Sequence, residues 1–295
     1  MPGWRFSLQS DIGGPAPLRP NVGRAPHRKN MQTLAKIAVA LVLMTASTVG
    51  RAQVVATNGL SVSALLPSAE KGNVEAEYNL GMLYLKQGTG AGPDFAKAIP
   101  WLIKAADANQ PHANLVLGQL YSAGQGVPKD DAESAKRNKR AEALYQTAAN
   151  RRDVKAQVML GDMYFNGWGV AMDKKAAIGW YTQAATNGST EVKTSLGCAY
   201  LSTGDFTNAA KWLKQGAEAG DLKAQSNLGQ LYLKGVGVAK DTAQGIKWAR
   251  LAAEKGDPTA QSNLGVCYRD GVGVEKDQKQ ADEWFAKARA PRPQM

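Results

Sequence analysis

The sequence is poor in the residue types from which disulfide frameworks and histidine-based sites are built. It has two cysteines and two histidines in 295 residues. A fold held by disulfides would need more cysteines at regular spacings. A histidine metal site or a catalytic triad would need more than His112, the one histidine outside the N-terminal segment. The G-x-S-x-G and H-E-x-x-H motifs of serine hydrolases and zinc proteases are also absent.

A strong net charge on the body of the chain is missing as well. The formal net charge is +11, but residues 1–52 hold seven Lys or Arg and one Asp. The other 243 residues carry 29 Lys or Arg against 24 Asp or Glu, which leaves only +5. The composition therefore gives no argument for a nucleic-acid partner. With 44% hydrophobic residues, the chain has enough apolar material for one large domain or an extended array.

The N-terminal apolar run is too short for a transmembrane helix, which needs about 20 residues. This run, Ile37 to Met44, follows Lys36, and Gly50 and Ala52 place small residues at −3 and −1 before Gln53. We therefore predict a Sec-type signal peptide over residues 31–52, cleaved near Ala52, and a periplasmic or secreted protein. The alternative is an uncleaved anchor, which would be the only contact with a membrane. Residues 1–30 are rich in Pro, Gly and Arg without periodicity, so we interpret them as disordered or as an over-long start before Met31.

Internal repetition is what the sequence has in abundance. The pattern Ala, three residues, Leu-Gly, two residues, Tyr recurs six times, with Val for Ala in the fourth copy. Ala76, Leu80, Leu83 and Tyr84 fall on one face of a helix, so each copy predicts an amphipathic helix. A glycine inside a helix costs about 1 kcal/mol relative to Ala, and six such glycines suggest close approach by a neighbouring helix. These glycines are Gly81, Gly118, Gly161, Gly197, Gly229 and Gly265.

A second helix is predicted after each of these. An Asp that can cap its N-terminus stands seven residues before a Trp in five repeats. In the second repeat Leu144 takes the Trp position, fourteen residues after Asp130. Seven additional residues are about two helical turns, so the insertion lengthens the helix and keeps its apolar face in phase. The tryptophans are expected to pack in the core: Trp101, Trp180, Trp212, Trp248 and Trp284.

The connection between the two helices contains a glycine pattern that also occurs in phosphate-binding loops. Residues 234–241 read KGVGVAKD, and related loops occur as GQGVPKD, GWGVAMD and GVGVEKD. Each follows a predicted helix and not a strand, and none has the G-K-[ST] ending of a P-loop. The glycines are therefore predicted to end the first helix, and the Asp to begin the second.

These motifs together resemble the Sel1-like repeat family, relatives of the tetratricopeptide repeats. The resemblance covers about residues 60–290; the fourth repeat lacks the G-x-G-V loop and the second has a longer second helix. It implies an all-α, right-handed superhelical solenoid of about six helical hairpins with a concave face. The boundaries would be a degenerate capping helix at 53–72, six repeats at 73–290 and a tail at 291–295. Members of the family are mostly adaptors and scaffolds, and bacterial members are often exported with envelope or host-interaction roles.

On each first helix, the positions at −2, +2 and +5 from the central leucine point away from the predicted buried stripe. They are unusually apolar in repeats one to three, which favours a groove for a partner peptide or helix. The alternative is that the curvature of the solenoid already buries them. Trp168 lies in a turn and is a further candidate for exposure. The predicted partner-binding residues are Tyr78, Met82, Leu115, Gln119, Asp162, Phe165, Trp168 and Gln230.

The inserted segment of the second repeat carries a cluster of cations, Lys136, Arg137, Lys139 and Arg140. It predicts contact with an acidic partner or surface, or else a solvated helix face that nearby carboxylates offset.

Cys198 and Cys267 lie two repeats apart. Stacked helices are about 8–10 Å apart, too far for a disulfide, so both are expected to be free thiols. The family's cysteine-rich branch pairs cysteines within each repeat, which this sequence does not match.

One motif points to an enzyme. Ser68 and Lys71 form an S-x-x-K match to the nucleophile motif of β-lactamases and penicillin-binding proteins. The cysteine-rich branch of the family has been associated with β-lactam binding. However, the K-T-G and S-D-N motifs are absent. We therefore expect an exported scaffold for a protein partner in the bacterial envelope, with no catalysis, cofactor or metal of its own. A β-lactam-active or peptidoglycan-active enzyme is the alternative.

Overall fold

The computed structural model describes residues 61–87, 92–189 and 191–290. The predicted signal peptide, the segment before it and the tail at 291–295 lie outside the described residues. Within the described ranges there are thirteen helices and no strand. Their bounds are α2 (Val62–Glu70), α3 (Val74–Gln87), α4 (Phe95–Asp107), α5 (Pro111–Ala123), α6 (Asp131–Asn150), α7 (Val154–Asn166), α8 (Lys174–Thr186), α9 (Val192–Thr203), α10 (Phe206–Glu218), α11 (Leu222–Lys234), α12 (Thr242–Glu254), α13 (Pro258–Asp270) and α14 (Gln278–Arg289).

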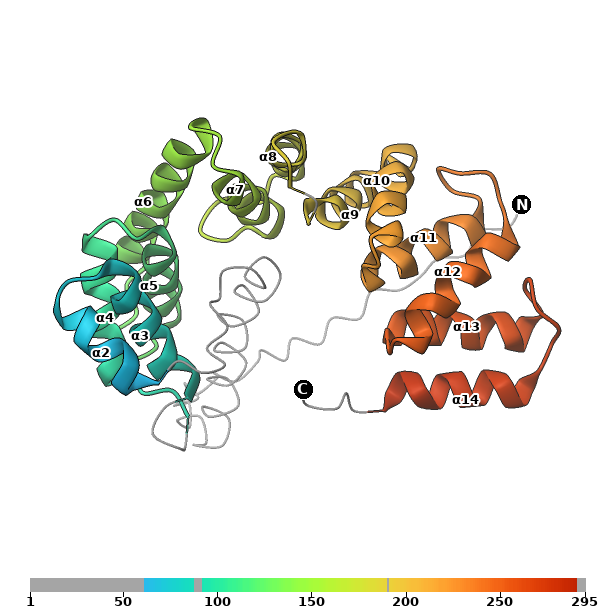
Figure 1. The fold of residues 1–295 in the computed structure, drawn as a ribbon, viewed down its shortest axis with the longest axis horizontal. Helices are drawn as coiled ribbons and strands as arrows, with labels where there is room; N and C mark the ends of the chain where they lie inside the picture. Colours follow the sequence, from blue (N-terminus) through green and yellow to red (C-terminus); the bar gives the residue numbers. More distant parts are fainter. Residues whose placement is uncertain (1–60, 88–91, 190, 291–295) are drawn as a thin grey trace, which may run out of the picture.

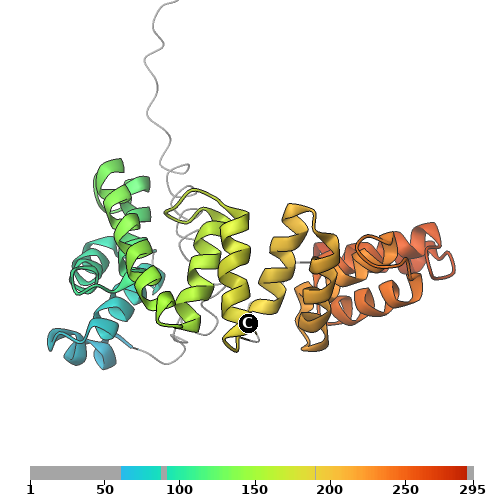
Figure 2. The same cartoon turned by 90° about the horizontal axis from the view of Figure 1, so that it is seen from above.

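The helices form an arch of six hairpins, from α3–α4 to α13–α14, with α2 at the N-terminal end (Figure 1). In the middle of the arch, α7 and α9 lie on the inner side and α8 and α10 on the outer side. Seen from above, successive hairpins stand side by side in a row (Figure 2). The predicted all-α solenoid of six hairpins is therefore confirmed. Within the described ranges, no helix combines the length and hydrophobicity needed to cross a membrane.

Each hairpin is held by a close contact at the glycine of its first helix. A methyl group at Gly197 would come within 2.7 Å of Leu213, and one at Gly161 would overlap the ring of Tyr181. In every hairpin the contacts include the residue eight positions after the Asp that caps the second helix. These pairs are Gly81 with Leu102, Gly118 with Asn138, Gly161 with Tyr181, Gly197 with Leu213, Gly229 with Ala249 and Gly265 with Phe285. The predicted close approach at these glycines is confirmed.

The loops between paired helices are turns built by glycine and aspartate. Gly235 ends α11 in the left-handed conformation, with φ of 68°, which favours a residue without Cβ. Asp241 begins α12, and its carboxylate accepts a hydrogen bond from the backbone N–H of Gln244 at 2.9 Å. The KGVGVAKD stretch is thus helix-terminating and helix-capping, as the sequence predicts.

Successive hairpins are joined by a hydrogen bond that the sequence analysis missed. Gln225 in α11 donates its side-chain amide N–H to the carbonyl of Ala217 near the end of α10, at 3.1 Å. The last carbonyls of a helix lack partners within it, so these buried amides satisfy them across the repeat boundary. The same bond recurs from Asn114 to Ala106, from Gln157 to Ala149 and from Gln261 to Ala253.

The cysteines follow their prediction, and the tryptophans pack against the core without being fully buried. Cys198 and Cys267 are free. Each repeated tryptophan is half-buried and packs against a buried cluster that includes the preceding hairpin. Trp248 of α12, for example, packs against the cluster formed by α10 and α11.

The third repeat offers a matched pair of glycines for testing the close contact. Gly161→Ala pushes a methyl into the buried Tyr181 ring and is expected to lower the free energy of unfolding by about 1–3 kcal/mol. Gly179→Ala, in α8 with nothing within 4 Å, is expected to raise it by about 0.5–1 kcal/mol. Urea unfolding followed by circular dichroism measures both. Effects of the same sign would contradict the packing role of Gly161.

Candidate functional site

The second repeat departs from the regular pattern through the length of α6. This helix has 20 residues, whereas the second helices α4, α8, α10 and α12 have 13 each. The predicted lengthening by two turns is confirmed. The N-terminal part of α6 pairs with α5 through Gly118, and its C-terminal part packs against α7 through Tyr145 and Ala149.

The extra turns shift the third repeat along α6. In regular repeats, the second glycine of the loop packs against the second helix of the preceding repeat, at the residue that directly follows its capping Asp. Thus Gly126 meets Phe95, and Gly237 meets Phe206. Gly169 instead meets Asn138, eight residues beyond Asp130. A shift of seven residues is about 10 Å along a helix. The loop of repeat three therefore lies farther from the loop of repeat two than it would in a regular array.

The tryptophan position is duplicated in α6. Leu144 stands seven residues before the C-cap Arg151, as Trp101 stands seven before the C-cap Ala108. Counted from the N-cap Asp130, however, the equivalent residue is Arg137. The assignment of Leu144 alone to this position was therefore incomplete, because an in-phase insertion gives two residues the same place on the helix.

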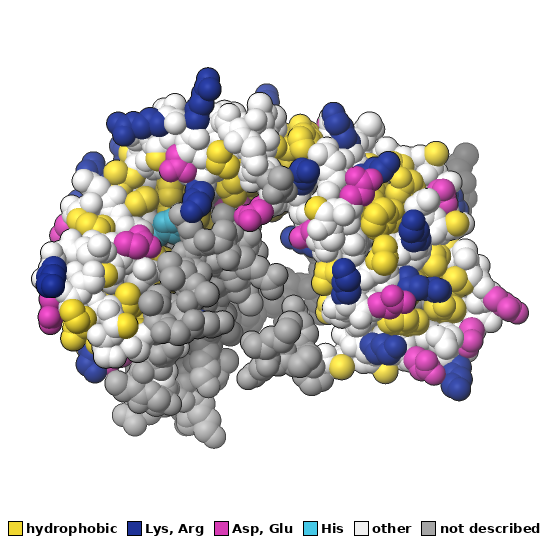
Figure 3. Space-filling model, viewed as in Figure 1, with side chains coloured by type: hydrophobic (Ala, Val, Ile, Leu, Met, Phe, Trp, Pro, Cys, Tyr) yellow, Lys and Arg dark blue, Asp and Glu magenta, His cyan; other side chains and the backbone are white. Residues whose placement is uncertain are grey.

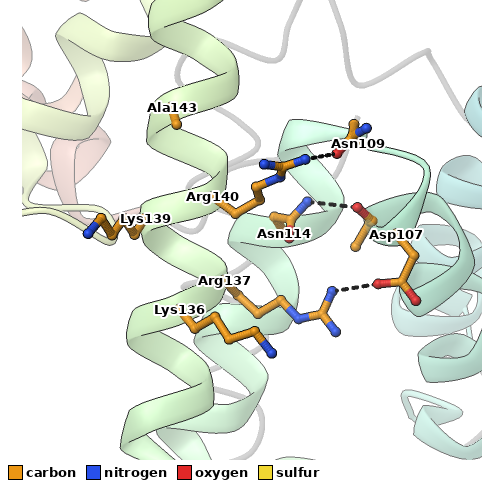
Figure 4. Close-up of a pocket in the computed structure, with 9 residues that line it drawn as sticks. Asp107, Asn109, Asn114, Lys136, Arg137, Lys139, Arg140 and Ala143 are labelled. Atoms are coloured by element: carbon orange, nitrogen blue, oxygen red, sulfur yellow. Dashed lines mark hydrogen bonds and ion pairs between the residues drawn. The ribbon is translucent and has the colours of Figure 1, made fainter.

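A basic cavity of about 570 Å³ lies beside Arg137, between α6 and the α4–α5 turn (Figure 4). Arg137 donates to Asp107 Oδ1 at 3.0 Å and to Glu133 Oε1 at 2.8 Å. Lys136 also binds Glu133, at 3.0 Å. The hydrogen bonds from Lys136 and Arg137 hold the pKa of Glu133 below its usual value. The residues that line this basic cavity are Ala106, Asp107, Asn109, Asn114, Lys136, Arg137, Lys139, Arg140 and Ala143.

Ion pairing makes the predicted cationic cluster smaller than its sequence suggests. Lys136 and Arg137 are engaged by carboxylates of the chain itself. Arg140 and Lys139 are exposed. Arg140 reaches the neutral side chain of Asn109, while Lys139 points away from the turn (Figure 4). Elsewhere, basic and acidic side chains are interspersed over the C-terminal half in the view of Figure 3.

A second cavity, of about 710 Å³, lies where the loops of repeats two and three are drawn apart. It brings together two predicted partner-binding residues, Gln119 from α5 and Trp168 from the α7–α8 loop. None of its lining side chains is charged, and we call it the neutral cavity. Its lining residues are Gly118, Gln119, Ser122, Ala123, Gln125, Ser134, Asn138, Asn166, Gly167, Trp168, Gly169, Val170 and Ala171.

Four of the predicted partner-binding residues are buried, which corrects the expectation that they present open surface. Tyr78, Met82, Leu115 and Asp162 are 6%, 8%, 7% and 3% exposed. Tyr78 lies 5.8 Å from the ring of His112, which in turn makes an edge contact with Tyr145 at 5.3 Å. Met82 packs in the cluster of α3, α4 and α5, and Leu115 packs against α6 and α7. Packing by neighbouring hairpins therefore covers this side of the first helices.

Asp162 is a buried acid with one satisfied oxygen. The Tyr181 hydroxyl donates to its Oδ1 at 2.5 Å, and its Oδ2 has no hydrogen-bond partner. Burial raises the pKa of this carboxyl to about 7, against the opposing effect of the Tyr181 hydrogen bond. Phe165 lies 6.5 Å from the Tyr181 ring. Phe165, Gln119, Trp168 and Gln230 are half-buried, so these four retain some accessible surface.

The residues of the enzyme alternative lie apart from both cavities. Ser68 is half-buried on α2, and Lys71 is the exposed C-cap of that helix. Neither lines the basic cavity or the neutral cavity. Among the described residues, no group of three or more His, Cys, Asp or Glu is placed to hold a metal ion.

Comparison with known proteins agrees with the repeat geometry. The family model described as Sel1 repeat matches residues 74–110, 111–153, 154–189, 199–221, 222–257 and 258–290. This chain belongs to the Sel1 repeat family. The second match is the longest of the six, because it includes the lengthened α6.

Individual proteins resemble the chain at moderate identity. Chitin synthase regulatory factor 3 of Schizosaccharomyces pombe is 28% identical over 181 residues, covering 59% of this chain and 19% of that protein. The chain thus spans about a fifth of that curated relative. The Sel1 repeat protein from Oxalobacter formigenes has 35% identity and a TM-score of 0.56, covering 74% of this chain and 88% of that one. A protective antigen of uropathogenic Escherichia coli has 32% identity and a TM-score of 0.58, and the match covers 78% of this chain and 48% of that one.

The raised pKa of Asp162 makes stability depend on pH. The folded chain holds this proton more tightly than the unfolded chain, so stability is greatest below about pH 4 and is lost as pH rises toward 7. Asp162→Asn stays neutral and keeps an acceptor for the Tyr181 hydroxyl. Relative to the parent, it is expected to raise the free energy of unfolding at pH 8 by on the order of 2–4 kcal/mol, with little change at pH 4.

Urea unfolding at pH 4, 6 and 8 checks this prediction. Asp282→Asn, on the exposed face of α14, is the control and should change the free energy of unfolding little at any pH. An equal effect of Asp162→Asn at all three values would show that the carboxyl is not buried in its neutral form.

Proposed function

We propose that this Sel1 repeat protein is an exported adaptor that holds a protein partner against its second repeat, without catalysis of its own. The observation that carries the proposal is the two-turn lengthening of α6, which opens a cavity on either side of this helix within an otherwise regular solenoid. A solenoid positions binding surface through the stacking of rigid repeats. The fungal relative is named as a regulatory factor of a synthase, a role exerted on another protein.

The basic cavity fits an acidic segment of the partner. Arg140 is exposed and hydrogen-bonded to a neutral side chain, so its guanidinium can receive a carboxylate. Lys139 beside it adds charge at the rim. Arg137 is held by Asp107 and Glu133, and it serves to support the wall of the cavity. Phe165 and Gln230, both half-buried, lie on α7 and α11 and line neither cavity, so the proposed surface at the second repeat does not include them.

Site-specific photo-crosslinking in cells tests this surface. A photoreactive residue at Ala143, beside the basic cavity, is expected to give a discrete cross-linked product of defined mass. The same residue at the exposed Leu251 of α12 is the control position. Lys139→Glu with Arg140→Glu should reduce the Ala143 product at least about fivefold, because like charges repel an acidic segment.

The matched charge reversal uses a different second helix. Lys211→Glu with Lys214→Glu on α10, where both lysines are exposed, should leave the Ala143 product unchanged. The proposal fails if both double variants have the same effect, or if Leu251 gives the same product as Ala143.

Export is tested separately by processing. Bacteria that express the chain with a C-terminal tag should contain, in the periplasmic or secreted fraction, a product whose N-terminal residue is Gln53. A chain that keeps residues 31–52 and stays in the cytoplasm would contradict export, and the adaptor function would then have to be sought there.

A further inference from the structure

The neutral cavity differs from the equivalent places in the other repeats in a chemically consistent way. Because the chain contains six copies of one unit, its regular repeats show which residues the fold needs at each position. Four residues after the capping Asp, the other repeats have Ala or Gly, and repeat two has Ser134. Eight residues after it, the others have Leu, Tyr, Ala or Phe, and repeat two has Asn138.

The loop positions show the same departure. Between the two loop glycines, repeats five and six have Val236 and Val272, whereas repeats two and three have Gln125 and Trp168. Repeat two thus has amides and a hydroxyl at positions where other repeats have small or apolar residues. These side chains line one cavity together with the indole of Trp168.

Three amides that line this cavity have an oxygen without a hydrogen-bond partner. Gln119 Oε1, Gln125 Oε1 and Asn138 Oδ1 are buried and have no hydrogen-bond partner. Buried polar atoms without partners are rare in folded proteins, and each one costs free energy. All three side chains line one cavity, so a ligand bound there can supply hydrogen bonds to them. The terminal torsions of Asn and Gln are broad, so each amide can turn toward a group in the cavity.

The lining excludes most ligand classes. A charged ligand or an arginine anchor would find no counter-charge, since no lining side chain is ionised. A purely apolar anchor would leave the three amide oxygens unpaired. The ligand that fits has hydroxyl donors and acceptors around its edge and a C–H face that can lie on the indole of Trp168. The volume of about 710 Å³ is within the roughly 300–1,000 Å³ of small-ligand sites.

We propose that the neutral cavity binds an uncharged saccharide of a few hexose units, held by the amides of Gln119, Gln125 and Asn138 and stacked on Trp168. This activity is separate from partner binding at the basic cavity, on the other side of α6. Exported proteins meet such saccharides at the cell envelope, but the proposal rests on the cavity and does not depend on export.

The test titrates the purified full chain with neutral trisaccharides of glucose and of N-acetylglucosamine, measured by calorimetry and by ligand-detected NMR. We expect at least one of them to bind with a dissociation constant of about 1 mM or tighter. An acidic trisaccharide of galacturonic acid is expected not to bind.

The variants introduce residues that other repeats carry at the same positions, and the melting temperature of each variant checks its fold. Asn138→Leu takes the residue of repeats one and four, and Trp168→Val takes that of repeats five and six. Each is expected to weaken saccharide binding at least tenfold without lowering the melting temperature. Gln119→Val introduces the residue that repeat six has at this position, Val266, and should weaken binding similarly. The matched control is Gln230→Val, the same position in repeat five, which should bind as the parent does.

Several outcomes would overturn the proposal. One is the absence of binding by every neutral trisaccharide at about 10 mM. Another is binding that survives both Trp168→Val and Asn138→Leu, which would place the saccharide elsewhere. A third is preference for galacturonic acid with loss in the Lys139 and Arg140 double variant, which would place the ligand in the basic cavity. Finally, if uncharged peptides selected from a phage library bind in a Trp168-dependent way while saccharides do not, the ligand class is wrong.

Discussion

The contact between the first-helix glycine and the second helix is the constraint on which this solenoid depends. In every hairpin the glycine meets the residue eight positions after the capping Asp. This contact therefore sets both the distance between the two helices and the register of one helix along the other. A methyl at this point would overlap or crowd the partner helix. The glycines therefore tolerate a helix-propensity cost of about 1 kcal/mol each because close packing of the two helices offsets it.

The same constraint explains why a single lengthened helix changes the molecule locally. The N-terminal part of α6 keeps the glycine contact of its own hairpin through Asn138. Its C-terminal part provides the Tyr145, Ala148 and Ala149 face that the third repeat packs against. Seven residues are two turns, so both halves keep their apolar stripes in phase. The third repeat is displaced along α6 by about 10 Å, and the neutral cavity lies between the two loops that this displacement separates.

Buried polar groups in this protein fall into two kinds. The amides of Gln157, Gln225 and Gln261 bond carbonyls of the preceding hairpin, and they join repeats. Asp162 Oδ2 and the amide oxygens around the neutral cavity lack partners. A structural role accounts for the first kind, since the last carbonyls of each second helix need donors. Three atoms of the second kind, Gln119 Oε1, Gln125 Oε1 and Asn138 Oδ1, belong to side chains that line the neutral cavity beside α6, where the regular repeat pattern is broken. Departures of this sort are expected at functional sites.

The sequence by itself determined the hairpins, their caps and loops, the in-phase lengthening of α6 and the free cysteines. These features depend on local rules, namely helical periodicity, left-handed glycine and Asp capping, which act within one or two repeats. Only the tertiary structure decided which side chains remain accessible. Periodicity tells which way Tyr78, Leu115 and Asp162 point on their own helices, but not that His112, Tyr145 and Tyr181 cover them. Likewise, the neutral cavity joins Gln119 to Trp168 across 49 positions of sequence, because their separation in space is set by how one repeat stacks on the next.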